Sequence, residues 1–146
     1  MSNRTIRTYL AEHMPLLMVL LARIVSKDER VVIVGSATDG RKALCSASTL
    51  TPDLVVTDLH MPGLDGVECT RRLKKLPNPP IIFMVTSDAT SEARARSLAA
   101  GADAPLVKGA NLAPQLLSAI SEFFPDDRDE HDAEPEHFCE RFTTVE

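Results

Sequence analysis

Short runs of β-branched and other apolar residues recur along the chain, and segments of helical length separate them. The apolar runs lie at residues 6–10, 31–34, 54–57, 81–85 and 105–107. The segments that fit helices lie at residues 16–25, 41–50, 67–76, 92–100 and 112–124. The pattern therefore predicts five strands that alternate with five helices.

The strand runs are continuously hydrophobic and do not alternate between apolar and polar residues. Residues 31–34 read Val-Val-Ile-Val, and residues 81–85 read Ile-Ile-Phe-Met-Val. Strands read this way when helices cover both faces of their sheet, as in parallel sheets connected by helical crossovers. The predicted fold class is therefore α/β, with a doubly wound, five-stranded parallel sheet.

Polar side chains stand at the carboxyl ends of four predicted strands: Glu12 and His13, Asp58, Thr86, and Lys108. In an open parallel sheet these ends meet in one crevice, which is where such folds bind ligands. An acid as nucleophile, with a lysine and a hydroxyl to neutralise and hydrogen-bond the transferred oxygens, predicts a site that handles phosphoryl groups. Spacing alone leaves open that these residues only cap helices.

Composition narrows the class of protein. The chain has 146 residues, of which 44% are hydrophobic and 25% charged, which is typical of one globular domain. The apolar run at residues 14–22 is far shorter than the roughly 18 residues that suggest a membrane span, and no cleavable leader precedes it. We therefore expect a cytoplasmic protein with no membrane partner. Cys45, Cys69 and Cys139 lack metal-ligand spacing and are predicted to be free thiols.

Charge divides the chain into two parts. Residues 126–146 carry nine acids and two arginines, a net charge of −7, which leaves +2 on residues 1–125. We therefore predict a folded domain at residues 1–125 and an acidic C-terminal tail at residues 126–146. The small positive charge of the domain gives little reason to expect binding to nucleic acid.

One segment carries a specific motif. In the sequence from residue 52 to residue 66, Asp58 is followed four residues later by Pro62 and eight residues later by Gly66. This segment resembles the phosphoacceptor segment of two-component response-regulator receiver domains. Residues 34–40, 83–87 and 101–108 match further receiver segments in order, and the resemblance covers roughly residues 4–124. It is closest to receivers of the nitrate-regulator type, whose lysine is commonly not followed by proline, as at Gly109 here.

The resemblance implies a flavodoxin-like receiver fold with strand order 2-1-3-4-5. It implies that Asp58 is phosphorylated by a sensor histidine kinase or a histidine phosphotransfer protein, and that Thr86 and Lys108 contact the phosphoryl group. It also implies a Mg²⁺ ion held by Glu12, Asp58 and the backbone carbonyl of His60. A homodimer is a further expectation from the family, and the chain is not expected to be an enzyme.

Two positions depart from the family pattern. Receivers usually end the first strand with two acids, but here the second acid is replaced by His13. Either His13 only packs at the start of the first helix, or it changes the metal site toward Mn²⁺ or another transition metal, because imidazole suits softer ions than Mg²⁺. Pro105 stands where the family has an aromatic switch residue, three before Lys108. Either proline prevents an edge strand from pairing with another chain, or the coupled movement of Thr86 and an aromatic residue is absent here.

The first predicted helix is apolar on every face. Met18, Val19 and Ala22 occupy positions that are typically polar in the family, so we expect them to form an exposed apolar strip. In the family the first helix commonly docks the phosphodonor, which makes this strip a candidate partner surface. The alternative is cover by the tail, where Phe138, Phe142 and Val145 have helical spacing and could supply that cover.

Three functions compete on this sequence. The first is a stand-alone receiver that takes a phosphoryl group on Asp58 and changes its affinity for a partner. The second is a pseudo-receiver, an interaction module of the same fold that works independently of phosphorylation, which His13 and Pro105 would explain. The third is a small phosphatase-like enzyme that uses Asp58 on a metabolite, although the chain has no insertion to build a substrate pocket.

Overall fold

The computed structural model describes residues 4–126, which form five strands and five helices in strict alternation. Their order along the chain is β1 (Ile6–Ala11), α1 (Pro15–Val25), β2 (Val31–Ala37), α2 (Gly40–Leu50), β3 (Leu54–Asp58), α3 (Gly66–Leu73), β4 (Ile81–Thr86), α4 (Ser91–Ala100), β5 (Ala104–Val107) and α5 (Leu112–Phe123). The predicted acidic tail lies outside the described residues apart from its first residue, Asp126.

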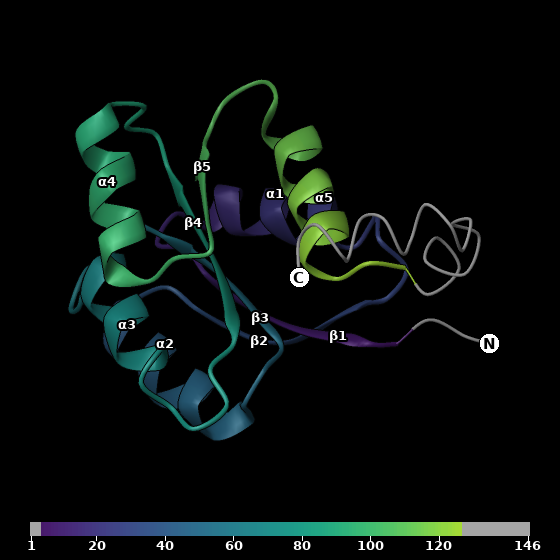
Figure 1. Cartoon of the computed structure of the whole chain (residues 1–146), viewed down its shortest axis with the longest axis horizontal. Coiled ribbons are helices and arrows are strands. Elements are labelled where there is room, and N and C mark those ends of the chain that lie inside the picture. The colour runs from purple at the N-terminus through teal and green to yellow at the C-terminus, as the bar shows by residue number, and fades with distance from the viewer. Residues whose placement is uncertain (1–3, 127–146) are drawn as a thin grey trace, which may run out of the picture.

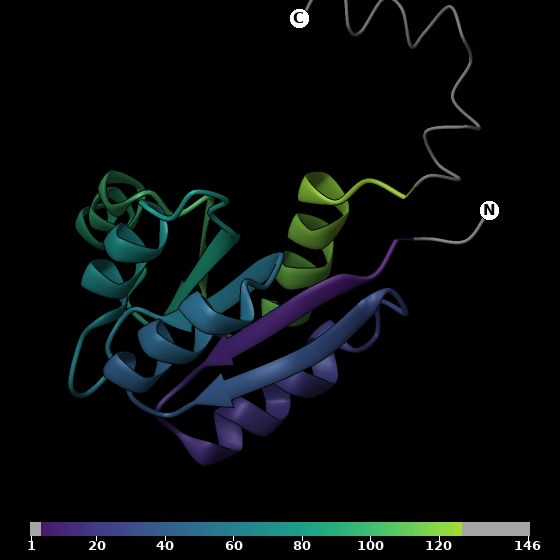
Figure 2. The same ribbon diagram turned by 90° about the horizontal axis from the view of Figure 1, so that it is seen from below.

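The strands form one parallel sheet in the order β2-β1-β3-β4-β5, which confirms the predicted fold and strand order. Helices α1 and α5 cover one face, and α2, α3 and α4 cover the other, as Figures 1 and 2 show. The first face holds a core that joins Leu10, Leu21, Val56 and Leu116. The second face holds cores around Tyr9 and Met84.

Burial explains why the strand sequences read as continuous apolar runs. All five residues of the central strand β3 are buried, and β4 is buried except at its first residue. The edge strands β2 and β5 are only partly buried. Strands covered on both faces favour apolar side chains, with Thr57 and Asp58 of β3 as buried polar exceptions, whereas edge strands can carry exposed residues.

Helix α3 is shorter than the sequence predicts. It ends at Leu73, whereas the pattern suggested a helix to residue 76. Pro77 follows, and proline disfavours helical backbone in the residue before it. Lys74 is the C-cap residue of α3. Its Nζ donates to the carbonyl of Pro80 at 2.7 Å and pairs with Asp103 at 2.7 Å.

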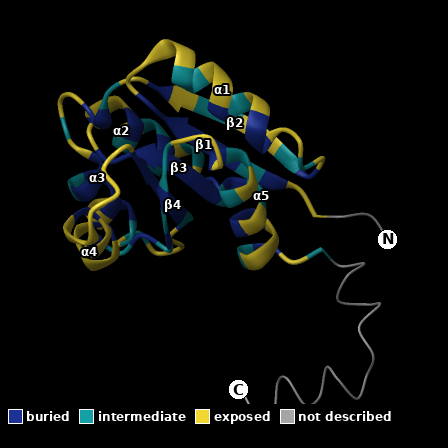
Figure 3. Cartoon of the chain, turned by 90° about the horizontal axis from the view of Figure 1, so that it is seen from above, coloured by how far each residue is buried: buried dark blue, intermediate teal, exposed yellow. Residues whose placement is uncertain are grey.

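The expected apolar strip on α1 needs a correction. Met18 and Ala22 are half-buried and pack against the core between α1 and α5. Of the three residues predicted to be exposed, Val19 alone is exposed, and Leu16 and Leu20 are exposed as well. Figure 3 shows exposed segments along α1. The sequence of an all-apolar helix does not reveal which face the sheet covers. The prediction therefore included two residues that lie partly on the covered face.

The described part of the chain contains no helix that is both long enough and apolar enough to cross a membrane.

Candidate functional site

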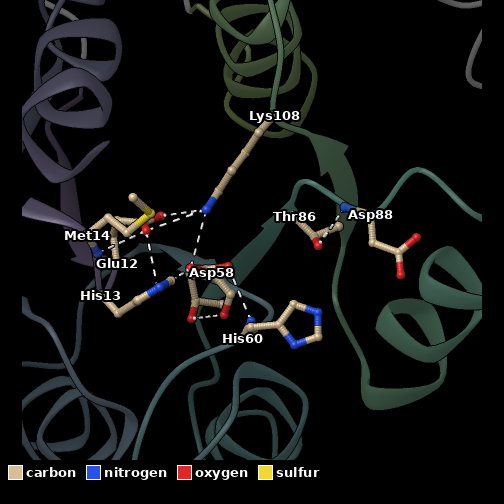
Figure 4. Close-up of polar contacts among 9 residues, drawn as sticks. Glu12, His13, Met14, Asp58, His60, Thr86, Asp88 and Lys108 are labelled. Carbon is tan, nitrogen blue, oxygen red and sulfur yellow. Dashed lines mark hydrogen bonds and ion pairs between the residues drawn. The ribbon is translucent and has the colours of Figure 1, made fainter. Parts of the chain in front are cut away.

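Asp58 is the last residue of β3, at the carboxyl edge of the sheet where the sequence placed the site. Its side chain is only 3% exposed. Three groups contact its carboxylate: His13 Nδ1 lies 2.8 Å and Lys108 Nζ 3.3 Å from Oδ2, and the backbone N–H of His60 donates to Oδ1 at 3.2 Å (Figure 4). A buried carboxylate among donors is therefore the centre of the crevice.

The loop after Asp58 explains the spacing of the motif. A Cβ atom on Gly66 would lie 2.1 Å from the backbone oxygen of Asp58, so only glycine lets α3 begin this close to the end of β3. The backbone N–H of Gly66 donates to the carbonyl of Leu59 at 2.8 Å. The carbonyl of Pro62 accepts from the N–H of Gly40 at 2.9 Å, which ties the loop to the start of α2.

Lys108 directly follows β5, and its side chain reaches the crevice. Its backbone N–H donates to the carbonyl of Thr86 at 2.8 Å, which holds the start of its side chain beside β4. Its Nζ lies 3.1 Å from Oε1 of Glu12 and 3.3 Å from Oδ2 of Asp58. The ammonium group of Lys108 thus lies beside two buried carboxylates, that of Glu12 after β1 and that of Asp58 at the end of β3.

Glu12 follows β1 and is fully buried. Its Oε2 accepts from the N–H of Met14 at 3.2 Å, and its Oε1 makes no hydrogen bond of good geometry although Lys108 Nζ is close. Burial raises the pKa of the Glu12 carboxyl above its ordinary value, and repulsion from Asp58 raises it further. The Met14 amide and Lys108 act in the opposite direction. This carboxylate is therefore costly to keep ionised without a nearby cation.

His13 lies between β1 and α1, and its ring reaches into the same crevice. Its Nδ1 is 2.8 Å from Oδ2 of Asp58 and 3.6 Å from Oε2 of Glu12, while 40% of its side chain remains exposed. His13 therefore contacts the phosphoacceptor candidate, and its effect on metal binding stays a prediction. Its imidazole occupies space beside Asp58 that a second acid would otherwise share.

Glu12, His13 and Asp58 form a group that could hold a metal ion, since one ligand atom from each lies within 4.8 Å of the others. The buried Oε1 of Glu12, which makes no hydrogen bond, is an available oxygen ligand. These residues fit a divalent cation. Two carboxylates and one imidazole would supply oxygen and nitrogen ligands to such an ion.

Thr86 ends β4 and is buried, on the side of Asp58 away from Glu12 and His13 (Figure 4). Its Oγ1 accepts from the backbone N–H of Asp88 at 3.1 Å. The imidazole of His60 is exposed, and the metal role predicted for its backbone carbonyl stays a prediction. The sequence reasoning missed the amides of Met14, His60 and Asp88, because every residue has an N–H and no side-chain pattern marks the useful ones.

Pro105 lies in β5, three residues before Lys108 and paired with Met84 of β4. Strand β5 is the last strand of the sheet, so the expectation that this proline lies on an edge strand agrees with the structure. Its ring has no side-chain rotation with which to follow a movement of Thr86.

One cavity in the described part of the chain, of about 520 Å³, lies away from this site. Its lining includes Arg4 and Asp53, which precede β1 and β3, so it opens at the opposite ends of the strands from Asp58. This cavity is therefore separate from the crevice around Asp58.

Comparison with known proteins identifies the family. The family model of the response regulator receiver domain matches residues 9–121. The chain is 35% identical over 121 residues to protein-glutamate methylesterase/protein-glutamine glutaminase 2 of Methanospirillum hungatei JF-1, which covers 81% of this chain and 35% of that protein. It is 46% identical over 90 residues to the gliding motility regulatory protein of Myxococcus xanthus, covering 60% of this chain and 12% of that protein. The chain thus spans about a third or less of the length of these relatives.

Solved structures show the same fold. The response regulator domain of Thermotoga maritima CheB superposes with a TM-score of 0.74 at 26% identity, over 82% of this chain and 96% of that chain. The receiver domain of NarL from Mycobacterium tuberculosis gives 0.73 at 21% identity, over 82% and 98%. The latter shows the fold alone, so the nitrate-regulator subtype stays a prediction. Fold, strand order and family match agree that the chain belongs to the response-regulator receiver domains of two-component signal transduction.

Proposed function

We propose that this chain accepts a phosphoryl group on the carboxylate of Asp58 and thereby changes its affinity for a partner. The observation that carries the proposal is the position of Asp58: a buried carboxylate at the end of β3, 3.3 Å from the ammonium group of Lys108. An oxygen of Asp58 forms the new O–P bond while the bond between phosphorus and the donor breaks, and the electron pair of that bond leaves with the donor. Catalysis in such a transfer consists mainly of positioning and charge neutralisation.

The residues around Asp58 divide this work. Lys108 neutralises charge on the phosphoryl oxygens, and the hydroxyl of Thr86 hydrogen-bonds one of them. A divalent cation, when bound, neutralises further charge at the same oxygens. Glu12, Asp58 and the backbone carbonyl of His60 would hold that cation, and His13 adds a nitrogen ligand. We propose Mn²⁺ or another transition metal as the better ion and Mg²⁺ as a weaker one, since imidazole suits the softer ions.

The donor in this proposal is a phosphorylated histidine on a sensor kinase or a phosphotransfer protein, and we propose a cytoplasmic location for the chain. The receiver at residues 1–125 performs no turnover of its own in this proposal. A phosphorylated receiver can also pair with a second copy, so a homodimer stays part of the proposal. Nothing in the charge of residues 1–125 favours nucleic acid as the partner.

Intact-protein mass spectrometry tests the proposal. The full chain is incubated with acetyl phosphate and either Mn²⁺ or Mg²⁺, and we expect the addition of one phosphoryl group. Asp58→Asn should remove the product, whereas Asp65→Asn should retain it. Asp65 is the matched control, because it lies on the same loop and its side chain accepts from the N–H of Glu68 as the N-cap of α3, a role that asparagine also fills.

The opposite result has a clear meaning. If the wild-type chain gains no phosphoryl group with either cation, or if Asp58→Asn gains it equally, Asp58 is not the acceptor. A chain that binds its partner without phosphorylation of Asp58 would act as a pseudo-receiver.

A further inference from the structure

Helix α1 carries an exposed apolar surface, the α1 strip, formed by Leu16, Val19 and Leu20 (Figure 3). These side chains are 83%, 56% and 43% exposed. They are spaced three and four residues apart, so they lie on one face of the helix. The opposite face, with Leu21, Ile24 and Val25, is buried in the core. Exposed leucines grouped on one helix face are typical of a surface that binds another apolar segment.

Two positive side chains lie toward the C-terminal end of α1 beyond the α1 strip, with one exposed acid, Glu29, near them. Arg23 lies one turn beyond Val19 and is exposed, Lys27 follows the helix and is also exposed, and α1 itself contains no acidic residue. A partner that presents an apolar helix face with acids around it would therefore fit this surface.

The chain leaves the domain beside α1. Helices α1 and α5 lie side by side on one face of the sheet, and Phe124 follows the end of α5 (Figure 1). The buried guanidinium of Arg30, in the connection between α1 and β2, donates to the carbonyl of Phe124 at 2.6 Å. The same side chain bonds both carboxylate oxygens of Asp28, at 3.1 Å and 2.9 Å. This contact fixes the start of the following segment near the C-terminal end of α1.

The sequence of that following segment has the required chemistry. Residues 127–146 contain eight acids and two arginines, a net charge of −6. Phe138, Phe142 and Val145 are spaced four and three residues apart, which would place them on one face of a helix. The eleven residues 127–137 can span up to about 35 Å when extended, whereas α1 is only about 16 Å long. The aromatic residues can therefore reach every part of the α1 strip.

We propose that residues 138–145 dock on the α1 strip of the same chain, with Phe138, Phe142 and Val145 against Leu16, Val19 and Leu20. The acids around this segment face Arg23 and Lys27. Tethering raises the effective concentration of the segment to the millimolar range, so a weak contact suffices to keep the strip covered.

Crosslinking of cysteine pairs in the full chain tests this docking. The segment has its own thiol, Cys139, next to Phe138. In a Cys45→Ser background, Val19→Cys places a thiol on the strip, and a short bis-maleimide joins it to Cys139. The matched control is Leu98→Cys, which is also exposed, at 46%, but lies on α4 across the sheet. Cys69 is buried and does not compete.

We expect the intrachain crosslink from Val19→Cys to form at least about tenfold faster than that from Leu98→Cys, because docking concentrates the thiols. Phe138→Ser with Phe142→Ser should reduce the rate to that of the Leu98→Cys control, and Phe138→Leu with Phe142→Leu should preserve it. Equal rates at the two positions would overturn the proposal. So would crosslinks between chains that increase with concentration, which would place a second copy on the strip. None of these outcomes depends on phosphorylation of Asp58.

Discussion

The imidazole Nδ1 of His13 lies 2.8 Å from the carboxylate Oδ2 of Asp58, so the residue after β1 directly contacts the residue that ends β3. The same carboxylate oxygen lies 3.3 Å from Lys108 Nζ. An incoming cation must therefore share Asp58 with an imidazole and an ammonium group. The first two predictions, on the affinity for Mg²⁺ and on the choice of metal ion, depend on this contact.

The first prediction concerns Mg²⁺. Replacing His13→Asp supplies an oxygen ligand at a position where the chain has nitrogen, so we expect Mg²⁺ to bind about tenfold more tightly or better. Phosphorylation of Asp58 by acetyl phosphate in Mg²⁺ should become faster as well. Isothermal titration calorimetry measures the first effect. His13→Ala is the control, because it removes the imidazole without adding an oxygen. Tight binding by the wild type that His13→Asp does not improve would contradict this prediction.

The second prediction concerns the choice of metal. A donor set of two carboxylates and an imidazole should favour Mn²⁺ over Mg²⁺, and His13→Asp should reduce that preference because all its ligands are oxygen. Calorimetric titration of both ions into both proteins gives the ratio of affinities. A ratio that is the same in the two proteins would show that His13 is not a ligand.

The third prediction concerns pH and the buried Glu12. Burial, and then repulsion from Asp58, raise the pKa of this carboxyl in the folded chain. The contribution of Glu12 to the free energy of unfolding is therefore fully present below the pKa of an unfolded glutamate, about 4.3. It is lost as the pH rises through the higher pKa of the folded chain. Glu12→Gln cannot ionise, so its free energy of unfolding should rise relative to the wild type over this range.

Urea denaturation of both proteins across the acidic range measures this difference. In an Asp58→Asn background the pH dependence should be smaller, because one of the two causes of the raised pKa is gone. A wild-type chain that gains stability relative to Glu12→Gln as the pH rises would reverse the sign and refute the argument.

The fourth prediction concerns Gly66. A methyl group at this position would lie 2.1 Å from the backbone oxygen of Asp58 and 3.0 Å from Cα of Leu59, so α3 must move. We expect Gly66→Ala to lower the free energy of unfolding by about 3 kcal/mol, the upper range for overpacking. Gly109→Ala is the matched control, since its nearest atom would be 4.0 Å away. Similar losses in both variants, measured by urea denaturation, would show that the contact with Asp58 is not the cause.

The fifth prediction concerns thiol reactivity. Burial raises the pKa of the Cys69 thiol to about 11, whereas Cys45 is exposed. Thiolate is the reactive form, so in a Cys139→Ser background the folded chain should react rapidly at Cys45 only, at about pH 8. Both thiols should react once the chain is unfolded. Rapid labelling of Cys69 in the folded chain, located by peptide mass spectrometry, would show that α3 opens readily.

Much of the fold and part of the site follow from the sequence. The continuous apolar run at residues 81–85 predicts the buried strand β4, because helices cover both faces of the sheet there. The run at residues 31–34 instead forms the edge strand β2, where Val32 and Ile33 are exposed. The spacing of Asp58, Pro62 and Gly66 predicts the loop after β3, since only a glycine tolerates the close approach to the Asp58 backbone. The positions of Thr86 and Lys108 at strand ends follow from the same pattern. These features depend on neighbours in the chain or on burial, which the sequence expresses directly.

Tertiary structure alone decided the rest. The pattern of α1 is apolar on every side, so only packing against α5 and the sheet shows that Met18 is half-buried while Leu16 is exposed. The sequence likewise could not show that His13 contacts Asp58, 45 residues away, and the effect of His13 on metal binding stays a prediction. The pairing of Lys108 with Glu12 spans 96 residues. Contacts of this kind depend on how side chains from separate strands are oriented in one crevice, and no local pattern in the sequence encodes that orientation.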